Sequence, residues 1–396
     1  MIMVKRVKVL FVGAGGVASA ATNILKHEKK VSLIICADRN LRRAREFIDF
    51  HNEKIVLRKV DASKTGEVAK LAKNVDLIVN ASLPDFNLKI MSAALKVGVD
   101  YQDLDSRLAD LRHAEQLSFD RQFKKEGLVG LINTGISPGL TNLVAAECAR
   151  RLNTIDSIKI RLLEDLHAKR FIFSWNPRIT VRELSSPVLV FSAGRFHIVK
   201  PFSSPEEYSF SQPAGQRPVY TIYGDEVATL PLYLNVKNVD YKSGGAEIEN
   251  ARALFQLGLF RRDRIKVNGT KISPFQVFCA LVRESPSPQK TIDFIRRGII
   301  EEGLLSIAVE VVGTKQKRKK IVRKDIISPA LTTITKKQPG ATYISYPTGA
   351  ATASFLLALP HIQRKGVFPP EALSPQTRKR VLEQAKRYKI YVKTVR

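Results

Sequence analysis

Cysteine, methionine and tryptophan are scarce in this 396-residue chain, which contains three, three and one of them respectively. The cysteines, Cys36, Cys148 and Cys279, are odd in number and lie far apart in apolar surroundings. This spacing excludes a disulfide framework and a cysteine-based zinc site, so we expect reduced thiols, a cytoplasmic location and no metal. No uninterrupted apolar run is long enough to span a bilayer, so we expect no membrane partner. The few residues before the apolar run at Val7 leave no room for a signal peptide.

Acidic residues are few relative to basic ones, because 37 Asp and Glu stand against 65 Lys and Arg, a formal net charge of +28. Half of the basic excess lies in two segments. The run from Lys315 to Lys324 contains no acid, and the segment from Ser374 to Arg396 has eight basic residues and one acid, Glu383. Such runs can bind phosphates non-specifically. The first run lacks aromatic residues for base stacking, so we expect solvated surface and no nucleic-acid partner.

A glycine-rich turn near the N-terminus is the most informative motif in the chain. The apolar run from Val7 to Val12 predicts a buried strand, and the residues after Ala18 predict a helix. Between them, Gly13-x-Gly15-x-x-Ala18 matches the dinucleotide-binding pattern in its required strand–turn–helix context. The first glycine allows the tight turn, the second lets a pyrophosphate approach the backbone, and the helix N-terminus offers oriented N–H groups.

The next apolar run ends in Asp38, which lies 20 positions after Ala18. An acid at this spacing hydrogen-bonds the adenosine ribose of NAD and repels the 2′-phosphate of NADP. Arg39 could instead stack on the adenine or bind that phosphate. We therefore expect NAD or NADP as cofactor, with a slight preference for NAD.

The overall pattern predicts an α/β protein of two domains. Strands alternate with helices up to Ile132, which predicts a Rossmann-type doubly wound parallel sheet over residues 1–135, completed by residues 346–396. From Asp156 the apolar residues alternate with polar ones, which predicts an α+β second domain over residues 136–345 with a mainly antiparallel sheet for substrate binding and dimerisation. Ligands of parallel sheets bind beyond the carboxyl ends of the strands. The expected cofactor-binding residues there are Gly13, Ala14, Gly15, Gly16, Val17, Ala18, Asp38, Arg39, Asp61, Ala62, Asn80, Ala81, Ser82, Leu83, Pro84 and Asn87.

Several further elements are expected from periodicity. Helices are predicted over residues 111–125, 249–257, 274–283 and 291–297, and a basic hairpin turn over residues 313–324.

A second helix start, after Asn133, follows the last strand of the first domain. In Gly135-Ile136-Ser137-Pro138-Gly139-Leu140-Thr141-Asn142, a proline turn leads into an apolar helix. Free N–H groups at such a start could hold a substrate carboxylate, and the alternative is a plain helix start. The candidate substrate-binding residues here are Ser137, Gly139, Thr141 and Asn142.

Six short motifs occur in an order that is similar to one known family. They are Val12-Gly13-Ala14-Gly15-Gly16, Asn80-Ala81-Ser82-Leu83-Pro84 with Asn87, Gly98-Val99-Asp100-Tyr101-Gln102-Asp103-Leu104, the segment Gly135 to Asn142, Phe173-Ser174-Trp175-Asn176-Pro177-Arg178, and Gly366-Val367-Phe368-Pro369-Pro370-Glu371. Together they span nearly the whole chain and resemble the saccharopine dehydrogenase-like oxidoreductases, which include saccharopine reductases and lysine 6-dehydrogenases. The chain departs from saccharopine reductases at Ser137, where an aspartate is frequent, and near Glu164 and Asp165, where a cysteine is expected.

The resemblance implies an NAD(P)-dependent oxidoreductase that oxidises or forms a C–N bond of an amino acid through an imine. It also implies a small amino-acid substrate and a homodimer built through the middle sheet. Arg178 is the implied clamp for a substrate carboxylate, because its planar fork matches a carboxylate bidentately. Glu164 and Asp165 are the candidate partners of the substrate amine, and Trp175 is either a wall of the substrate site or a core residue. Tyr101 and Asp103 are the candidate catalytic groups that orient substrate or relay protons, and the alternative for each is a structural hydrogen bond.

Two alternatives stay open at this point. One is a lysine 6-dehydrogenase or a polyamine-forming relative such as carboxynorspermidine dehydrogenase. The other is a non-catalytic, nucleotide-sensing scaffold whose basic tail contacts RNA or protein. Reduction of a nicotinamide nucleotide by an amino-acid substrate separates the enzymes from the scaffold.

Overall fold

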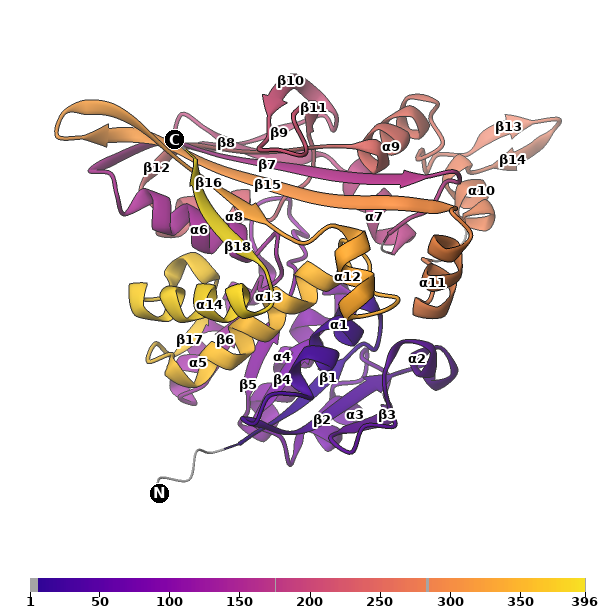
Figure 1. Cartoon of the computed structure of the whole chain (residues 1–396), viewed down its shortest axis with the longest axis vertical. Coiled ribbons are helices and arrows are strands. Elements are labelled where there is room, and N and C mark those ends of the chain that lie inside the picture. Colours follow the sequence, from indigo (N-terminus) through magenta and orange to yellow (C-terminus); the bar gives the residue numbers. More distant parts are fainter. Residues whose placement is uncertain (1–5, 175, 283–284, 396) are drawn as a thin grey trace.

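Two β-sheets organise the chain, one in the lower half of Figure 1 and the other across its top. The computed structural model describes residues 6–174, 176–282 and 285–395. The N-terminal third builds most of the lower sheet, and the middle of the chain builds most of the upper one. The result is the α/β architecture that the sequence predicts, with a parallel sheet in one domain and a mixed sheet in the other.

The lower sheet has seven strands, and each neighbouring pair is parallel. Strand β1 (Val7–Val12) lies inside the sheet between β4 and β2 and is buried from Val9 to Val12, as expected for a strand with helices on both faces of its sheet. The chain reverses direction across the sheet between β1 and β4, which is where doubly wound sheets bind ligands. In spatial order the strands are β17 (Gly366–Phe368), β6 (Val129–Leu131), β5 (Asp100–Asp103), β4 (Leu77–Asn80), β1 (Val7–Val12), β2 (Val31–Asp38) and β3 (Ile55–Lys59).

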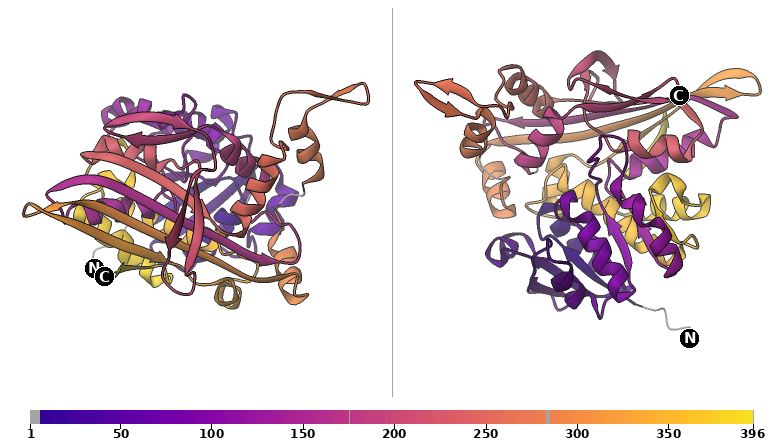
Figure 2. Two further views of the ribbon diagram at one scale, coloured as in Figure 1. Left: turned by 90° about the horizontal axis from the view of Figure 1, so that it is seen from above. Right: turned by 180° about the vertical axis from the view of Figure 1, so that it is seen from behind.

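Helices cover both faces of this sheet, with α1 and α13 on the face toward the viewer in Figure 1 and α3 and α4 on the face seen in the right view of Figure 2. Gly349 on α13 allows the close approach to α1, because a Cβ there would lie 2.6 Å from the Cβ of Ala20. The helices of this domain are α1 (Gly16–Leu25), α2 (Leu41–Phe47), α3 (Thr65–Ala72), α4 (Asn87–Val97), α5 (Asp120–Lys125), α13 (Ser345–Ala358) and α14 (Pro375–Arg387).

The upper sheet has nine strands and is mainly antiparallel, with β7 and β12 as the parallel pair among the described strands. The path of the sheet is β10-β11-β12-β7-β15-β16-β18, and β8 and β9 join at β12. The bounds are β7 (Thr154–Ala168), β8 (Val188–Ser192), β9 (Arg195–Val199), β10 (Ser203–Ser209), β11 (Gln216–Thr221), β12 (Val236–Gly244), β15 (Ile300–Lys315), β16 (Arg318–Ile327) and β18 (Tyr391–Val395).

Helices α6 and α8 lie between the upper sheet and the lower domain in Figure 1, and they pack on β15 and β12 respectively. The short hairpin β13 (Ile265–Val267) and β14 (Thr270–Ile272) projects from the opposite end of the sheet to the β15–β16 turn. The helices of this domain are α6 (Leu140–Ala149), α7 (Pro177–Ser185), α8 (Glu226–Tyr233), α9 (Ala246–Gln256), α10 (Pro274–Leu281), α11 (Pro288–Arg296) and α12 (Leu331–Lys337). No helix in the described ranges is both long and apolar enough to cross a membrane.

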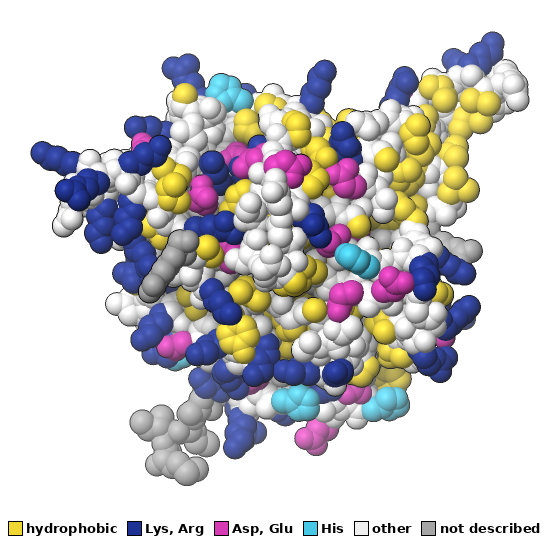
Figure 3. Space-filling model, turned by 45° about the horizontal axis from the view of Figure 1, so that its top comes forward, with side chains coloured by type: hydrophobic (Ala, Val, Ile, Leu, Met, Phe, Trp, Pro, Cys, Tyr) yellow, Lys and Arg dark blue, Asp and Glu magenta, His cyan; other side chains and the backbone are white. Residues whose placement is uncertain are grey.

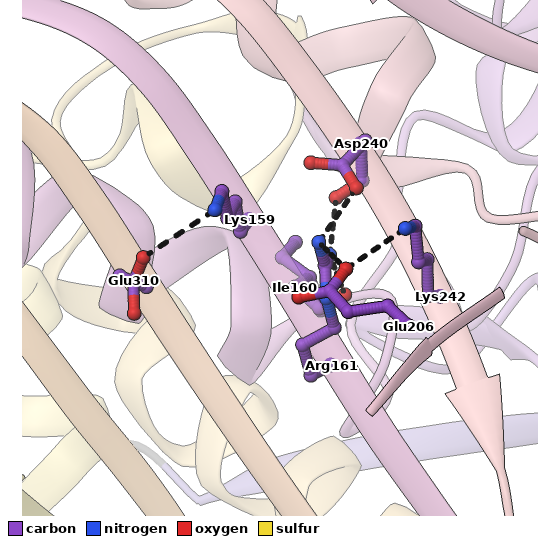
Figure 4. A network of polar contacts seen from close by, with 7 residues as sticks. All are labelled: Lys159, Ile160, Arg161, Glu206, Asp240, Lys242 and Glu310. Atoms are coloured by element: carbon purple, nitrogen blue, oxygen red, sulfur yellow. Dashed lines mark hydrogen bonds and ion pairs between the residues drawn. The ribbon is translucent and has the colours of Figure 1, made fainter. Parts of the chain in front are cut away.

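A charged network braces the outer face of the upper sheet (Figure 4). Arg161 on β7 is 1% exposed, and its guanidinium lies 2.9 Å from Glu206 on β10 and 2.8 Å from Asp240 on β12. Lys242 also reaches Glu206, at 2.8 Å. These contacts tie the β10–β11 hairpin to the sheet, because a buried guanidinium needs paired carboxylates to offset its lost hydration.

Two expectations about element boundaries need correction. Strand β18 does not return to the parallel sheet with the rest of residues 346–396, because it pairs antiparallel with β16 in the upper sheet. The helix expected over residues 111–125 is shorter than predicted. Only α5 forms there, and a 3₁₀ turn over Glu115–Phe119 precedes it. The chain before that turn instead takes an irregular path, with Leu111 at a φ of +60°.

The basic hairpin turn lies where the sequence predicts it, between Lys315 and Arg318. Figure 3 shows Lys and Arg side chains gathered on this projecting end of the upper sheet, at the left of the view. All three cysteines are free: Cys36 and Cys148 are buried, and Cys279 is half-buried.

Candidate active site

The glycine-rich turn has the shape that a bound pyrophosphate requires. Gly13 has a φ of +98°, and a Cβ there would lie 2.6 Å from the backbone of Ala81, so the close crossing of the β1 and β4 loops needs glycine. A Cβ on Gly15 would meet no atom within 4 Å. The first turn of α1, from Gly16, carries no acid and its N-cap has no side-chain hydrogen bond, so its N–H groups suit an anion. These residues fit a dinucleotide phosphate.

This turn opens onto a cavity of about 870 Å³ that residues from both domains line. The lower domain contributes the carboxyl ends of β1 to β4 and the loop after β5. Among the residues expected to bind the cofactor, those that line the cavity are Gly13, Ala14, Gly15, Gly16, Val17, Asp38, Arg39, Asp61, Ala62, Ala81, Ser82, Leu83 and Pro84. Ala18 is buried in α1 and does not line it.

Asn80 and Asn87 lie behind the cavity wall and shape the loop after β4. The side-chain oxygen of Asn80 accepts hydrogen bonds from the backbone N–H and the hydroxyl of Ser82, at 2.9 and 2.6 Å. Its amide donates to Asn87 at 2.6 Å. We therefore correct their expected role from cofactor contact to support of Ser82, which does line the cavity.

Asp38 is tied to the glycine-rich turn itself. The backbone N–H of Ala14 donates to its Oδ2 at 3.1 Å, and the backbone N–H of Asn40 donates to its Oδ1 at 2.8 Å. These bonds hold the carboxylate beside the turn, where an adenosine ribose is expected. Arg39 and Arg43 line the same end of the cavity and bring positive charge to it.

The upper domain lines the other part of the cavity with acids, most of which sequence reasoning missed. Of the described residues that line this part, Arg182 alone is basic, and it is 2.7 Å from Asp85 in an ion pair. The carboxyl side chains come from five separate places in the chain, one of them the loop after β5 in the lower domain, and are Asp105, Glu164, Glu183, Asp225, Glu226 and Glu247.

Glu164 and Asp165 point to opposite faces of β7, because neighbouring side chains alternate along a strand. Glu164 lines the cavity, whereas Asp165 does not and accepts a hydrogen bond from the backbone N–H of Ala246 at 3.1 Å. Asp165 also lies 3.1 Å from His167 in a pair outside the cavity. The expected pair of amine-binding acids on this strand is therefore reduced to Glu164.

The second acid beside Glu164 is Glu247 at the start of α9. Its carboxylate accepts hydrogen bonds from the hydroxyls of Ser174 and Tyr343. Burial, together with the charge of Glu247, raises the pKa of Glu164 to about 8. Two carboxyls in this setting favour a protonated state until a cation enters, so the pair suits an ammonium group.

The Gly135–Asn142 segment forms hydrogen bonds to Glu226. Its Oε1 accepts hydrogen bonds from Ser137 at 2.6 Å and from Thr141 at 2.7 Å. Burial raises the pKa of Glu226 to about 7. Ser137 lines the cavity, but Gly139, Thr141 and Asn142 lie behind it, and Asn142 accepts the N–H of Gly139 within the helix start. The segment therefore lines the cavity with residues 135–138, and the hydroxyls of Ser137 and Thr141 hold Glu226.

Tyr101 and Asp103 are buried in the lower domain and are not among the residues that line the cavity. The Tyr101 hydroxyl donates to Asn87 at 3.0 Å. Asp103 accepts from Gln116 at 3.0 Å and from the backbone N–H of Asn133 at 2.8 Å. Neither side chain reaches the cavity, so these contacts favour the structural hydrogen bonds that the sequence left open for both residues over a catalytic role.

Two candidates in the predicted substrate site lie outside the described residues. They are Trp175 and the side chain of Arg178. The residues between them, Asn176 and Pro177, line the cavity, and Pro177 begins α7.

Comparison with known proteins supports one family. The model of the saccharopine dehydrogenase NADP binding domain matches residues 9–131, and that of the saccharopine dehydrogenase C-terminal domain matches residues 135–390. Carboxyaminopropylagmatine dehydrogenase of Synechocystis sp. is 26% identical over 389 residues, covering 93% of each chain. Carboxynorspermidine synthase of Vibrio cholerae is 24% identical over 396 residues, covering 93% of this chain and 92% of the relative.

Two solved structures share the fold. Apo saccharopine dehydrogenase (L-Glu forming) from Saccharomyces cerevisiae superposes with a TM-score of 0.69 at 14% identity, over 98% of this chain and 100% of the other. Homospermidine synthase from Legionella pneumophila, in complex with NAD, superposes with a TM-score of 0.68 at 13% identity, over 98% and 91%.

Proposed function

Because the chain belongs to the saccharopine dehydrogenase family, we propose that its substrate is a polyamine that carries a carboxy group. Membership makes the chain an NAD(P)-dependent oxidoreductase that forms or oxidises a C–N bond of an amino acid through an imine. The scaffold alternative is therefore set aside. The proposal identifies the amino acid whose C–N bond is formed or oxidised as a carboxylated polyamine.

The acidic part of the cavity is the observation that carries this proposal. Six carboxyl side chains line it, and Arg182 is already paired with Asp85. A polyamine brings several ammonium groups that can pair with these acids as they ionise, whereas the three carboxylates of saccharopine would gain no such pairing. The names of the relatives agree, because carboxyaminopropylagmatine and carboxynorspermidine are polyamine derivatives with a carboxy group.

Different residues of the cavity would bind the two ends of such a substrate. Glu164 and Glu247 would face a distal ammonium group, because they lie together at the wall and burial favours their pairing with a cation. Arg178 stays our prediction for the group that binds the substrate carboxylate, since it follows Asn176 and Pro177 at the cavity wall. The bound nicotinamide supplies or accepts the hydride at the carbon of the C–N bond.

For the cofactor we propose a slight preference for NAD over NADP. Asp38 supports NAD, because its carboxylate is held beside the glycine-rich turn and would meet the 2′-hydroxyl. Arg39 and Arg43 lessen the penalty for a 2′-phosphate, so the preference is small.

A substrate screen with purified protein tests the proposal. Carboxynorspermidine, carboxyaminopropylagmatine, saccharopine and lysine are each offered with NAD and with NADP, and the reduced nicotinamide is followed by absorbance. The expected result is reduction with the carboxylated polyamines, and a Glu164→Gln variant should raise their KM. Reduction with saccharopine or lysine alone would contradict the proposal.

A further inference from the structure

Two carboxyl groups lie against each other in the cavity wall, at a place to which neither the family motifs nor the expected site residues point. Asp225, 1% exposed, precedes α8, and Asp105 follows β5. Their carboxyls are within hydrogen-bonding reach of each other. The backbone N–H of Ser106 donates to Oδ2 of Asp225 at 2.7 Å, and the hydroxyl of Tyr223 also lies beside this carboxyl. Ionised carboxyls only accept, so a hydrogen bond between the two needs one proton.

A buried network holds the turn that carries Asp105. The amide of Gln116 donates to the backbone oxygen of Asp105 at 3.3 Å and to the hydroxyl of Ser106 at 3.0 Å. That hydroxyl donates to Asn133 at 2.6 Å. The hydroxyl of Tyr223 donates to the backbone oxygen of Ser106 at 3.3 Å. The pair is therefore set in place by the protein itself, because its turn is bonded from three other segments.

The surroundings favour retention of that proton. Burial raises the pKa of Asp105 to about 7 and holds the pKa of Asp225 well above its usual range, with the facing carboxyl adding to the second effect. The charged and titratable groups that face the pair are Asp103 from β5, Arg182 and Glu183 from α7, Tyr223 from the loop before α8, and Glu226 from α8. Most of these are acids or neutral hydroxyls, which disfavour a second ionised carboxyl nearby.

We propose that Asp105 and Asp225 hold one proton between them and act together as the proton carrier for the reacting nitrogen of the substrate. The proposal rests on the proposed function in one respect, because it assumes an amine that must gain and lose protons in this cavity. Both side chains line the cavity, so the pair can reach a bound substrate directly.

The proton balance is complete with this one pair. In C–N bond formation the pair takes a proton from the attacking ammonium group, which leaves a neutral amine to add to the aldehyde carbon. The pair then returns that proton to the hydroxyl of the carbinolamine, which departs as water and leaves the protonated imine. Addition of hydride at the imine carbon gives a neutral secondary amine, and the shared proton moves to its nitrogen. Solvent restores the proton of the pair, and oxidation runs the same steps in reverse.

The test compares wild-type protein with Asp105→Asn and Asp225→Asn. Each amide keeps the shape and can donate to the remaining carboxylate, but it carries no transferable proton. We expect kcat to fall by roughly 10²- to 10⁴-fold in both variants, with NADH affinity unchanged and the pH dependence of kcat altered. Glu247→Gln is the matched control, because it removes another carboxyl of the same cavity that does not face the pair, and it should change KM more than the pH profile. Equal kcat and equal pH profiles in folded Asn variants and wild type would overturn the proposal.

A readout without turnover separates this proposal from the substrate proposal. Infrared difference spectra of wild-type minus Asp105→Asn protein at neutral pH should contain the C=O stretch of a protonated carboxylic acid. If this band is present in a protein that shows no turnover with any of the amines offered, the substrate proposal has failed but the proposal of a shared proton stands. If the band is absent from a protein that turns over polyamines, the proposal that Asp105 and Asp225 share a proton is overturned. If Asp225→Asn does not fold, the kinetic and infrared measurements can both be made on Asp105→Asn alone, because Asp105 is only half-buried.

Discussion

The guanidinium of Arg182 donates a hydrogen bond of 2.7 Å to Oδ2 of Asp85 and so joins the two domains at the cavity wall. Asp85 lies in the turn after β4 of the lower domain, and Arg182 lies on α7 of the upper one. Arg107 approaches the other oxygen of Asp85 at 3.5 Å. The position of α7 over the cavity therefore depends on a carboxylate that the cofactor-binding domain supplies.

The first prediction concerns this ion pair. Arg182→Gln and Asp85→Asn should each raise the KM of the substrate, because α7 loses its tether to the lower domain. In a double-mutant cycle on the free energy of unfolding, the coupling should be about 0.5–1 kcal/mol, since both side chains are partly exposed. Arg150→Gln, which breaks the surface pair with Glu147 far from α7, is the control and should leave KM unchanged. Equal KM in all variants would show that the pair does not position α7.

The second prediction separates the two glycines of the turn. Gly15→Val should fold normally, because its Cβ would meet no protein atom, but should weaken NADH binding by roughly tenfold or more, since it occupies the approach of the pyrophosphate. Gly13→Ala should instead lower the free energy of unfolding by ~1–3 kcal/mol or more, because of its positive φ and the 2.6 Å clash with Ala81. Calorimetric titration with NADH and chemical denaturation measure the two effects. Full NADH affinity in Gly15→Val would place the pyrophosphate elsewhere.

The third prediction concerns the choice of nucleotide. Asp38→Ala should weaken NADH binding by roughly tenfold or more, because a hydrogen bond to a charged group contributes about 1.5–3 kcal/mol. The same change should strengthen NADPH binding, since it removes a charge that repels the 2′-phosphate. Arg39→Gln should have the opposite effect and weaken the binding of NADPH more than the binding of NADH. Parallel titrations of the three proteins with both nucleotides provide the measurement, and an unchanged ratio of affinities in Asp38→Ala would contradict the assigned role of Asp38.

The fourth prediction is a dependence of stability on pH through Glu164. Burial raises the pKa of Glu164 to about 8 in the folded protein, against an ordinary value of 4.5. The stabilisation from its retained proton is therefore fully present below pH 4.5 and is lost as pH rises toward 8. Relative to Glu164→Gln, the wild-type free energy of unfolding should fall across this window by at most ~1.4 kcal/mol per pH unit. Parallel denaturation curves for the two proteins at several pH values test this, and equal slopes would show that Glu164 is ionised in the free protein.

The fifth prediction follows from the same group and concerns ligand binding. An amine that pairs with ionised Glu164 at pH 7 must displace its proton, so binding should release protons to the buffer. Calorimetry with a carboxylated polyamine in two buffers of different ionisation enthalpy measures the release. Glu164→Gln should remove that part of the signal. Identical heats for wild type in both buffers would mean that the amine does not meet this carboxyl.

Local signals in the sequence predict most of the residues that line the glycine-rich end of the cavity, because each of its parts is a short contiguous pattern. The Gly13-to-Ala18 turn needs only its flanking strand and helix, and Asp38 needs only a count of positions along the chain. The parallel order of the lower sheet follows in the same way, since strands joined through helices run parallel.

The acidic side could not be predicted, because Asp105, Glu183 and Asp225 are far apart in the sequence and share no motif. Sequence reasoning expected Glu164 and Asp165 to act together, and strand alternation separates them. For Tyr101 and Asp103 it left a catalytic role and a structural hydrogen bond open, and the burial of both side chains in the lower domain favours the second.

The amino-acid sequence by itself thus determined the dinucleotide fold, the glycine-rich turn after β1 and the family of the chain. Each of these depends on interactions between residues a few positions apart or on one strand–turn–helix unit. The tertiary structure alone decided which carboxyls gather at the cavity wall and that β18 joins the upper sheet. Those outcomes depend on burial and on contacts between distant segments, and these exist only after the two sheets have packed against each other.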